Sequence, residues 1–282
     1  MSRNVLDNCN PVSWVNGEPA SLVSINDRGL AYGDGLFETI RVQAGMPTLF
    51  DLHCKRLCSG AAVLRIPFDL EGFKREVGEF LQAQKLPEGV LKAIVTRGSG
   101  GRGYNPVGCE NPRRILSFHP LPAYKGSPGL SGIRLHECKT RMGDHAFAGL
   151  KHLNRLENVM ARSEWQGSDC LEGLLLGLDD RLVEGTMSNL FMVSGSTLLT
   201  PDLGRAGVNG VCREFIQEHA QGWGLKVETG DYSLEDLAGA EEVFVCNSVN
   251  GIWPVIACGD LNWSVGSVTC TVRDRVQEVL NA

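Results

Sequence analysis

The sequence predicts a two-domain α/β protein whose second domain is larger and richer in strands. Up to about residue 120, segments with the alternation of strands are interleaved with segments at helical spacing. Residues 120–129, PLPAYKGSPG, then place three prolines and two glycines in ten residues, a composition typical of a linker. Short strand-like segments dominate the rest of the chain, so we expect domains at residues 1–120 and 121–282.

The composition is that of a globular chain. Its 282 residues are 43% hydrophobic, and the formal net charge of −6 gives no basic footprint for nucleic acid. No apolar run approaches the roughly 18 residues of a membrane span, and the first residues lack the apolar stretch of a signal peptide. The ten cysteines and six histidines lack the spacing of a metal site. We therefore expect a cytoplasmic protein with reduced thiols that binds no metal, nucleic acid or membrane.

In the first domain, the pattern predicts a small sheet with two helices. Short strands are expected in VSWVNG and PASLV, and a hairpin that turns at AGMP is expected in LFETIRVQAGMPTLF. Asp51 in N-cap position and apolar residues at helical spacing from Leu57 to Leu64 predict a helix over residues 51–65. A second helix is expected in EGFKREVGEFLQAQKL, followed by strands in GVLKAIVTRG and RRILSFHPLP.

Beyond the linker, the pattern predicts strands broken by turns. The strand segments are IRLHECKTRM, GLLLGL, RLVEGTM, NLFMVSG, STLLTPD, EEVFVCNSV and WPVIACGD. Helices are expected in VCREFIQEHAQGWG, SLEDLAGA and TVRDRVQEVL. Most of residues 148–162, AGLKHLNRLENVMAR, is also expected to be an amphipathic helix, with Leu153, Leu156 and Met160 on its apolar face. Lys151 stands just before that helix.

Two glycine-rich segments are candidates for binding anionic groups. GSGGRG, residues 98–103, has the letters of a dinucleotide-binding turn, but the prolines after it disfavour the long helix that such a turn requires. We interpret it as a loop that carries Arg97 and Arg102 to the carboxylates of a substrate, or else as a solvated loop. In AGVNGVCREF, Gly210 precedes a helix that begins near Val211, so free backbone N–H groups there can bind a phosphate.

A lysine, an arginine, a glutamate and two small polar residues can complete such a site. Glu184 ends a strand in EGTMSNLF, where it either caps a hairpin or keeps a heteroaromatic nitrogen protonated. Arg56 is either an exposed helix residue or a phosphate contact, and Asn247 and Ser248 follow a buried strand. Lys151 is either a surface lysine or the amine that holds an aldehyde as a Schiff base. Together with the helix start, these are the parts of a pyridoxal 5'-phosphate site.

Seven motifs, in this order, relate the chain to a known family. It resembles the fold-type IV pyridoxal phosphate enzymes over residues 24–259, in the motifs DRGLAYGDGLFETIRV, HCKRL, RGSGGRGY, LKHLNRLENV, EGTMSNLF, AGVNGVCREF and FVCNSVNGIWPV. That group includes branched-chain and D-amino-acid aminotransferases and 4-amino-4-deoxychorismate lyases. The motifs RGSGGRGY and GLKHLNRLENV are most similar to the lyases.

The resemblance implies a fold, an assembly and an activity. The fold is two α/β domains, the second a strand-rich pseudo-barrel, with the cofactor pyridoxal 5'-phosphate between them, in a homodimer. The activity is that of a lyase of folate biosynthesis, which converts 4-amino-4-deoxychorismate to 4-aminobenzoate and pyruvate. A D-amino-acid or branched-chain aminotransferase is the alternative on the same fold, and a non-catalytic cofactor-binding protein is a further alternative of another class.

By the same resemblance, Lys151 binds the cofactor covalently and acts as the general base. Thr39 stands beside the GDGLFE motif, and from that position we expect it to position or relay a proton. Glu184 contacts the pyridine nitrogen. Phe37 stands where D-amino-acid aminotransferases carry a tyrosine near the cofactor, and we expect it to contact the substrate. We expect Arg97 and Arg102 to bind the substrate carboxylates. The residues expected around the cofactor phosphate are Arg56, Gly210, Val211, Cys212, Asn247 and Ser248.

Overall fold

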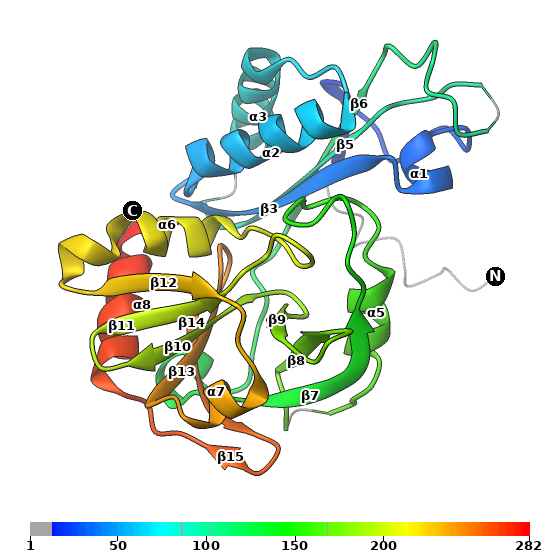
Figure 1. Cartoon of the computed structure of the whole chain (residues 1–282). Helices are drawn as coiled ribbons and strands as arrows, with labels where there is room; N and C mark the ends of the chain where they lie inside the picture. Colours follow the sequence, from blue (N-terminus) through cyan, green and yellow to red (C-terminus); the bar gives the residue numbers. More distant parts are fainter. Residues whose placement is uncertain (1–12, 86, 102, 168) are drawn as a thin grey trace, which may run out of the picture.

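The chain folds around two separate sheets. The structure is a computed structural model, and it describes residues 13–85, 87–101, 103–167 and 169–282 (Figure 1). Within these residues, six strands form a sheet between residues 13 and 119, and nine form a second sheet between residues 133 and 262. The predicted mixed α/β fold with a strand-rich C-terminal part is confirmed. We call residues 13–119 the N-terminal unit and residues 133–282 the C-terminal unit.

The N-terminal unit is built on an antiparallel sheet in the order β2-β1-β6-β5-β3-β4. The predicted hairpin is confirmed, because β3 and β4 pair and turn through Ala44 and Gly45. Both residues have positive φ, 50° and 77°, as the twist of a tight hairpin requires. The strands are β1 Ser13–Val15, β2 Glu18–Pro19, β3 Gly35–Gln43, β4 Met46–Pro47, β5 Gly89–Thr96 and β6 Arg113–His119.

Two helices, α2 (Phe50–Leu64) and α3 (Leu70–Gln84), cover one face of this sheet, while the short α1 (Arg28–Tyr32) precedes β3 (Figure 1). The prediction that Asp51 caps α2 is wrong. The helix begins at Phe50, and its N-cap, Leu49, makes no side-chain hydrogen bond. Asp51 lies in the first turn instead, where the helix dipole favours a negative charge. Buried side chains between helices and sheet include Ile40, Leu57, Phe73, Phe80, Leu91 and Leu116.

The other face of the N-terminal sheet meets the C-terminal unit. Burial alternates along β3, so Phe37, Thr39 and Arg41 lie on the face opposite the helices. The Arg41 guanidinium donates hydrogen bonds to the carbonyl oxygens of Leu280 at 3.0 Å and Val249 at 3.2 Å, both in the C-terminal unit. Side chains on this face of β3 therefore stand at the junction of the two units.

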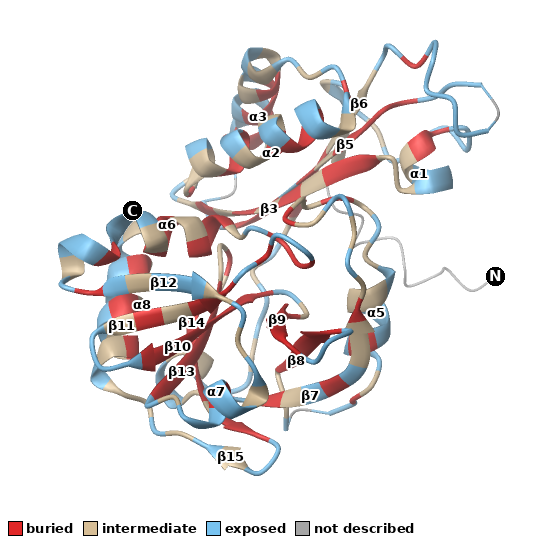
Figure 2. Cartoon of the chain, in the orientation of Figure 1, coloured by how far each residue is buried: buried red, intermediate tan, exposed pale blue. Residues whose placement is uncertain are grey.

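The C-terminal sheet runs in the order β12-β11-β10-β13-β14-β7-β8-β9, with β15 paired to β14. The last strand of this order, β9, also contacts β10 and β11, so the sheet curls back on itself as a barrel does. Figure 2 shows that its central strands are buried. The strands are β7 Ile133–Met142, β8 Glu172–Gly177, β9 Leu182–Gly185, β10 Asn189–Ser194, β11 Thr197–Pro201, β12 Lys226–Gly230, β13 Glu242–Asn247, β14 Gly251–Cys258 and β15 Leu261–Asn262.

Helices α6 and α8 pack side chains such as Ile216 and Val272 against Phe191 and Phe244 of the curled sheet. The 3-10 turn Ala220–Trp223 extends α6. In the described part of the chain, no helix has both the length and the apolar character needed to cross a membrane. The helices after residue 120 are α4 Pro128–Ser131, α5 Leu156–Arg162, α6 Val211–His219, α7 Leu234–Ala238 and α8 Ser267–Leu280.

The segment around Lys151 differs from its prediction. Helix α5 begins only at Leu156, and the preceding residues are extended beside β3. The Phe37 amide donates to the Lys151 carbonyl, and the Leu153 amide donates to the Gly35 carbonyl, both at 3.0 Å. These bonds to a distant strand outweigh the local helical pattern. Of the three residues expected on the apolar face, Leu153 lies before the helix, whereas Leu156 and Met160 lie on α5 and are 72% and 53% exposed, so the core of this subunit does not cover them.

Candidate active site

A cavity of about 380 Å³ lies between the two units. Its wall combines β3, the linker, the segment around Lys151, the turn after β9, the start of α6 and the end of β13. The fold therefore brings together residues that lie far apart in the sequence. Ten of the predicted site residues line this cavity: Phe37, Thr39, Arg56, Lys151, Glu184, Gly210, Val211, Cys212, Asn247 and Ser248.

Lys151 is fixed in the wall of the cavity by its own backbone and by its neighbours. Besides the bond from Phe37, the Arg155 guanidinium donates to the carbonyl oxygens of His152 at 3.0 Å and Leu150 at 3.2 Å. The Lys151 ammonium lies 4.3 Å from the centre of the Phe37 ring. Burial and the charge of Arg56 lower the pKa of Lys151 to about 8, so this amine gives up its proton more readily than an exposed lysine does.

Glu184, at the end of β9, presents a buried carboxylate to the cavity. One of its oxygens accepts hydrogen bonds from the Val208 amide at 2.9 Å and the Asn189 side chain at 3.2 Å. Burial raises the pKa of Glu184 to about 7, although the Val208 amide and the charges of Arg155 and Lys151 oppose that shift. Such a carboxylate gains most from a cationic partner, such as a protonated heteroaromatic nitrogen.

The start of α6 forms an anion-binding corner of the cavity. Its N-cap, Gly210, contributes no side chain, so the N–H groups of the first turn keep the positive end of the helix dipole open. A Cβ on Gly210 would collide with the Asn189 side-chain oxygen, which explains the glycine. Arg56 reaches this corner from α2, where one terminal nitrogen donates to the Asn209 carbonyl at 2.9 Å. An arginine and an open helix start together suit a phosphate.

Ser248 and Thr39 join the two units beside that corner. The Ser248 hydroxyl donates to the Thr39 carbonyl at 3.1 Å, so in this structure it is engaged with the backbone of β3. The Asn247 side-chain oxygen accepts the amides of Val249 at 3.0 Å and Asn250 at 2.8 Å. Asn247 therefore shapes the turn after β13, and the turn brings Ser248 against β3.

Arg97, which was expected to bind substrate, does not line the cavity in this structure. Its guanidinium pairs with both carboxylate oxygens of Asp34 at 2.8 and 3.0 Å. It also donates to the carbonyl oxygens of Leu64 at 2.7 Å and Arg65 at 2.8 Å, at the end of α2. The guanidinium of Arg97 therefore donates these hydrogen bonds within the N-terminal unit and helps to hold its fold together. The other predicted loop residue, Arg102, lies outside the described residues.

Sequence reasoning missed two residues on this side of the molecule. Lys92 of β5 pairs in register with Thr39 of β3, and its ammonium lies 5.8 Å from the centre of the Phe37 ring. The alternation of GVLKAIVT puts the exposed Lys92 on the cavity-facing side of the sheet, so a signal was present. Tyr124, in the linker, also lines the cavity and accepts a hydrogen bond from Asn250 at 3.3 Å. No sequence signal marked Tyr124.

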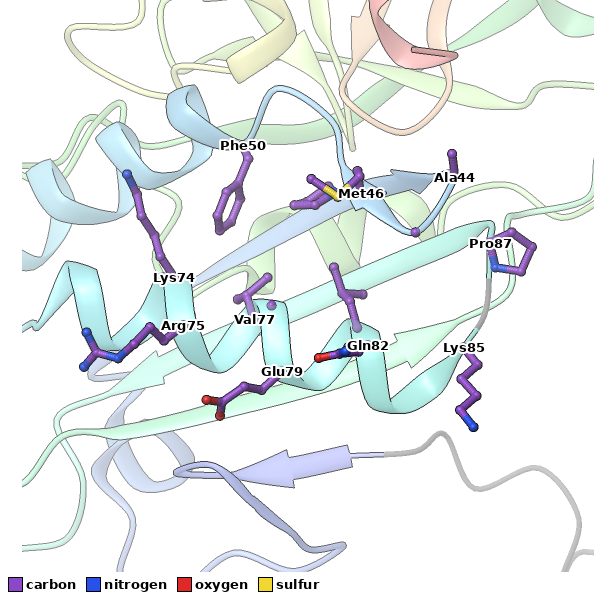
Figure 3. Close-up of a pocket in the computed structure, with 14 residues that line it drawn as sticks. Ala44, Met46, Phe50, Lys74, Arg75, Val77, Glu79, Gln82, Lys85 and Pro87 are labelled. Atoms are coloured by element: carbon purple, nitrogen blue, oxygen red, sulfur yellow. The ribbon is translucent and has the colours of Figure 1, made fainter.

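A larger groove of about 1060 Å³ lies on the surface of the N-terminal unit, between α3 and the β3–β4 turn (Figure 3). Apolar residues such as Met46, Phe50 and Val77 line it. Its charged residues Arg75 and Glu79 are exposed. The smaller cavity contains buried groups with strongly shifted pKa values, Lys151 and Glu184, whereas these two charged residues of the larger groove are exposed. The smaller cavity is therefore the better candidate for an active site.

Comparison with known proteins agrees with the site. The family described as Amino-transferase class IV matches residues 35–258. The chain is 36% identical to an aminodeoxychorismate lyase of Vibrio harveyi, over 86% of this chain and 89% of that protein. It is 30% identical to a putative branched-chain-amino-acid aminotransferase of Methanocaldococcus jannaschii, over 94% and 95%. A crystal structure of 4-amino-4-deoxychorismate lyase from Pseudomonas aeruginosa superposes with a TM-score of 0.93 at 47% identity, covering 96% of this chain and 100% of that one. The protein belongs to the class IV aminotransferase family.

Proposed function

We propose that this protein is a pyridoxal 5'-phosphate-dependent lyase of folate biosynthesis, which converts 4-amino-4-deoxychorismate to 4-aminobenzoate and pyruvate. The observation that carries the proposal is the convergence of Lys151, Glu184 and Arg56 with the start of α6 in one cavity. The lyase identity draws its support from the relatives of Vibrio harveyi and Pseudomonas aeruginosa.

The residues present fit this cofactor. Gly210 leaves open the corner where a phosphate would lie, and Arg56 borders it. Lys151 has the lowered pKa that a Schiff-base lysine needs, and buried Glu184 has an affinity for a protonated ring nitrogen. When bound, the cofactor supplies an electron sink for the carbon that carries the substrate amine.

The protein residues then hold and move protons. Lys151 Nζ would take the proton from ring carbon C4 of the substrate, as its lowered pKa permits. The ether bond to the enolpyruvyl group breaks, and the ring becomes aromatic. Lys151 then delivers a proton to the methylene carbon of the departing fragment, which gives pyruvate. Thr39 lines the cavity on the β3 side and is positioned to orient the substrate or relay that proton.

Lys92 replaces Arg97 as the proposed anchor for a substrate carboxylate. The substrate carries two carboxylates, and the protein has a formal net charge of −6, so local cations must bind them. Lys92 lies beside Thr39 and Phe37 on the face of β5 that borders the cavity. Both ammonium groups lie near the Phe37 ring, that of Lys92 at 5.8 Å and that of Lys151 at 4.3 Å from its centre.

An aminotransferase is the second candidate, because the Methanocaldococcus jannaschii relative covers 94% of this chain. Both activities would use Lys151, so the products distinguish them. We expect purified protein given 4-amino-4-deoxychorismate to release pyruvate and 4-aminobenzoate in equal amounts. Transfer of an amino group to a keto acid without 4-aminobenzoate would establish the aminotransferase instead. Borohydride reduction and mass spectrometry should find the cofactor mass on the peptide with Lys151, and its absence would reject the cofactor assignment.

We also propose a homodimer of two-domain subunits in the cytoplasm. Helix α5, at the edge of the cavity, exposes Leu156, Val159 and Met160 by 72%, 60% and 53%, an apolar face that a second copy would cover.

The prolines near residue 120 support a domain boundary there. The nine cysteines among the described residues are unpaired, as in a reducing compartment. Light scattering should give twice the 30.6 kDa of the chain, and a monomer would contradict the dimer.

A further inference from the structure

A buried carboxylate, Glu38, stands directly behind Arg56. Its two oxygens accept hydrogen bonds from Arg56 Nε at 2.8 Å and from one terminal nitrogen of Arg56 at 2.5 Å. Glu38 is 1% exposed, and its place on β3 puts it on the face opposite Thr39. Burial by itself would raise the pKa of Glu38, but Arg56 and His53 outweigh it and hold the pKa at about 2. Glu38 is therefore a fixed anion.

His53 holds that anion in place from the other side. Its Nδ1 lies 2.6 Å from a Glu38 oxygen, and the ring is 1% exposed. Burial lowers the pKa of His53, so the ring is neutral and Nδ1–H donates to Glu38. His53 and Arg56 are three residues apart on α2, which places both beside Glu38. The three side chains form one hydrogen-bonded unit.

Arg56 has N–H groups left over for a ligand in the cavity. A guanidinium has five N–H groups, and Glu38 and the Asn209 carbonyl use three of them. The two that remain lie one on each terminal nitrogen, and Arg56 lines the cavity. Such a pair matches two oxygens of a phosphate, provided that the plane of the guanidinium is fixed.

We propose that Glu38 is a positioning residue, which fixes the Arg56 guanidinium so that its two remaining donors meet the cofactor phosphate, and that His53 holds Glu38 in register. This inference rests on the proposed cofactor. Without Glu38, Arg56 would keep its charge but retain only the Asn209 carbonyl as a partner among the described residues. The orientation, and with it the selectivity for a phosphorylated ligand, would be lost.

The test compares pyridoxal 5'-phosphate with pyridoxal, which has the same aldehyde but no phosphate. Both dissociation constants are measured on cofactor-free protein by absorbance, for the wild type, Glu38→Gln and Glu76→Gln. Glu76 is a matched control, because it is also a buried carboxylate paired with an arginine, Arg114, but lies away from the cavity. We expect Glu38→Gln to lower the preference for the phosphorylated ligand by about tenfold or more, and Glu76→Gln to leave it unchanged.

A second readout follows the charge of Glu38. Glu38 raises and Arg56 lowers the pKa of Lys151, so Glu38→Gln should move the pH midpoint of pyridoxal addition to Lys151 downward. An unchanged preference in Glu38→Gln overturns the inference, as does a wild type without preference. If Glu38→Gln does not fold, Glu38→Asp decides, since its shorter side chain cannot reach both nitrogens and should lower the preference several-fold. A wild type that binds neither aldehyde overturns the proposed function instead.

Discussion

Two buried glutamates on neighbouring strands, Glu172 of β8 and Glu184 of β9, have opposite surroundings. Glu172 is 0% exposed and accepts five hydrogen bonds of 2.5–3.2 Å, from the backbone of Gly173, Thr186 and Met187 and the hydroxyls of Thr186 and Ser188. Glu184 is 3% exposed and accepts only two, both on one oxygen, in the described part of the chain. Burial raises the pKa of both carboxyls.

The difference separates a carboxylate that is fully engaged in the fold from one that is available to the proposed ligand. Glu172 fastens the turn of residues 186–188, which forms part of the cavity wall, and leaves no capacity for anything else. Glu184 keeps an oxygen free for the cavity and tolerates an unfavourable charge while no cationic ligand is present. Replacing each carboxylate with its amide should therefore give different losses.

The largest expected effect is on turnover. In the proposed function Glu184 keeps the cofactor nitrogen protonated, and Glu184→Gln removes that charge. We therefore expect kcat to fall by about 10²-fold or more, the scale of one preorganised electrostatic contact. Glu172→Gln, compared at equal folded fraction, should lower kcat by less than about tenfold. Steady-state assays at saturating cofactor measure both. Equal losses would erase the distinction between the two glutamates.

The next effect is on the stability of the Glu172→Gln variant. A glutamine has an NH2 group in place of one carboxylate oxygen. The backbone and hydroxyl donors that now bond to that oxygen would then face another donor, and each buried donor left unsatisfied costs about 1–3 kcal/mol. We expect the free energy of unfolding to fall by about 3 kcal/mol. Urea denaturation of the cofactor-free protein measures it. A variant as stable as the wild type would show that Glu172 does not fasten the turn.

Glu184→Gln should shift stability in the opposite direction, and only at higher pH. The pKa of Glu184 is raised from 4.5 to about 7 in the folded protein, so its stabilising contribution, complete below pH 4.5, is lost as the pH rises through 7. The amide cannot ionise, so the cofactor-free variant should become more stable than the wild type above pH 7, by at most about 3 kcal/mol. Denaturation at pH 5 and pH 8 tests this; a difference independent of pH would contradict the assignment.

The same distinction extends to two cations, with a smaller effect. Arg97 has its hydrogen-bonding capacity met within the N-terminal unit, as Glu172 does in its own turn, whereas Lys92 is exposed beside the cavity. Lys92→Met should raise KM by about tenfold and leave kcat within a few-fold, the loss of one charge-assisted contact. Arg97→Met should lower the melting temperature and leave KM within a few-fold. A raised KM in Arg97→Met and an unchanged KM in Lys92→Met would show that Arg97, not Lys92, binds the substrate.

Local signals were enough to select most of the candidate site. Glu184 and the glycine before α6 were identifiable because each stands at the end or start of an element, and the order of the motifs along the chain linked them to Lys151. The sequence did not show which residues far apart along the chain lie close together. Arg97 lies beside a glycine-rich loop as expected, yet Asp34 and the end of α2 engage its guanidinium.

The sequence by itself determined the class of fold, most strand and helix positions and the residues proposed for the site, because periodicity and turn residues act over a few positions. The tertiary structure decided what depends on distant partners. Pairing with β3, not helical spacing, sets the conformation around Lys151, since backbone hydrogen bonds to Phe37 and Gly35 are available there. The packing of the two units brings Lys151, Glu184 and Arg56 into one cavity, where burial shifts the pKa values of the first two. The order of residues along the chain does not show that these three lie close together, because their proximity depends on how the two units pack.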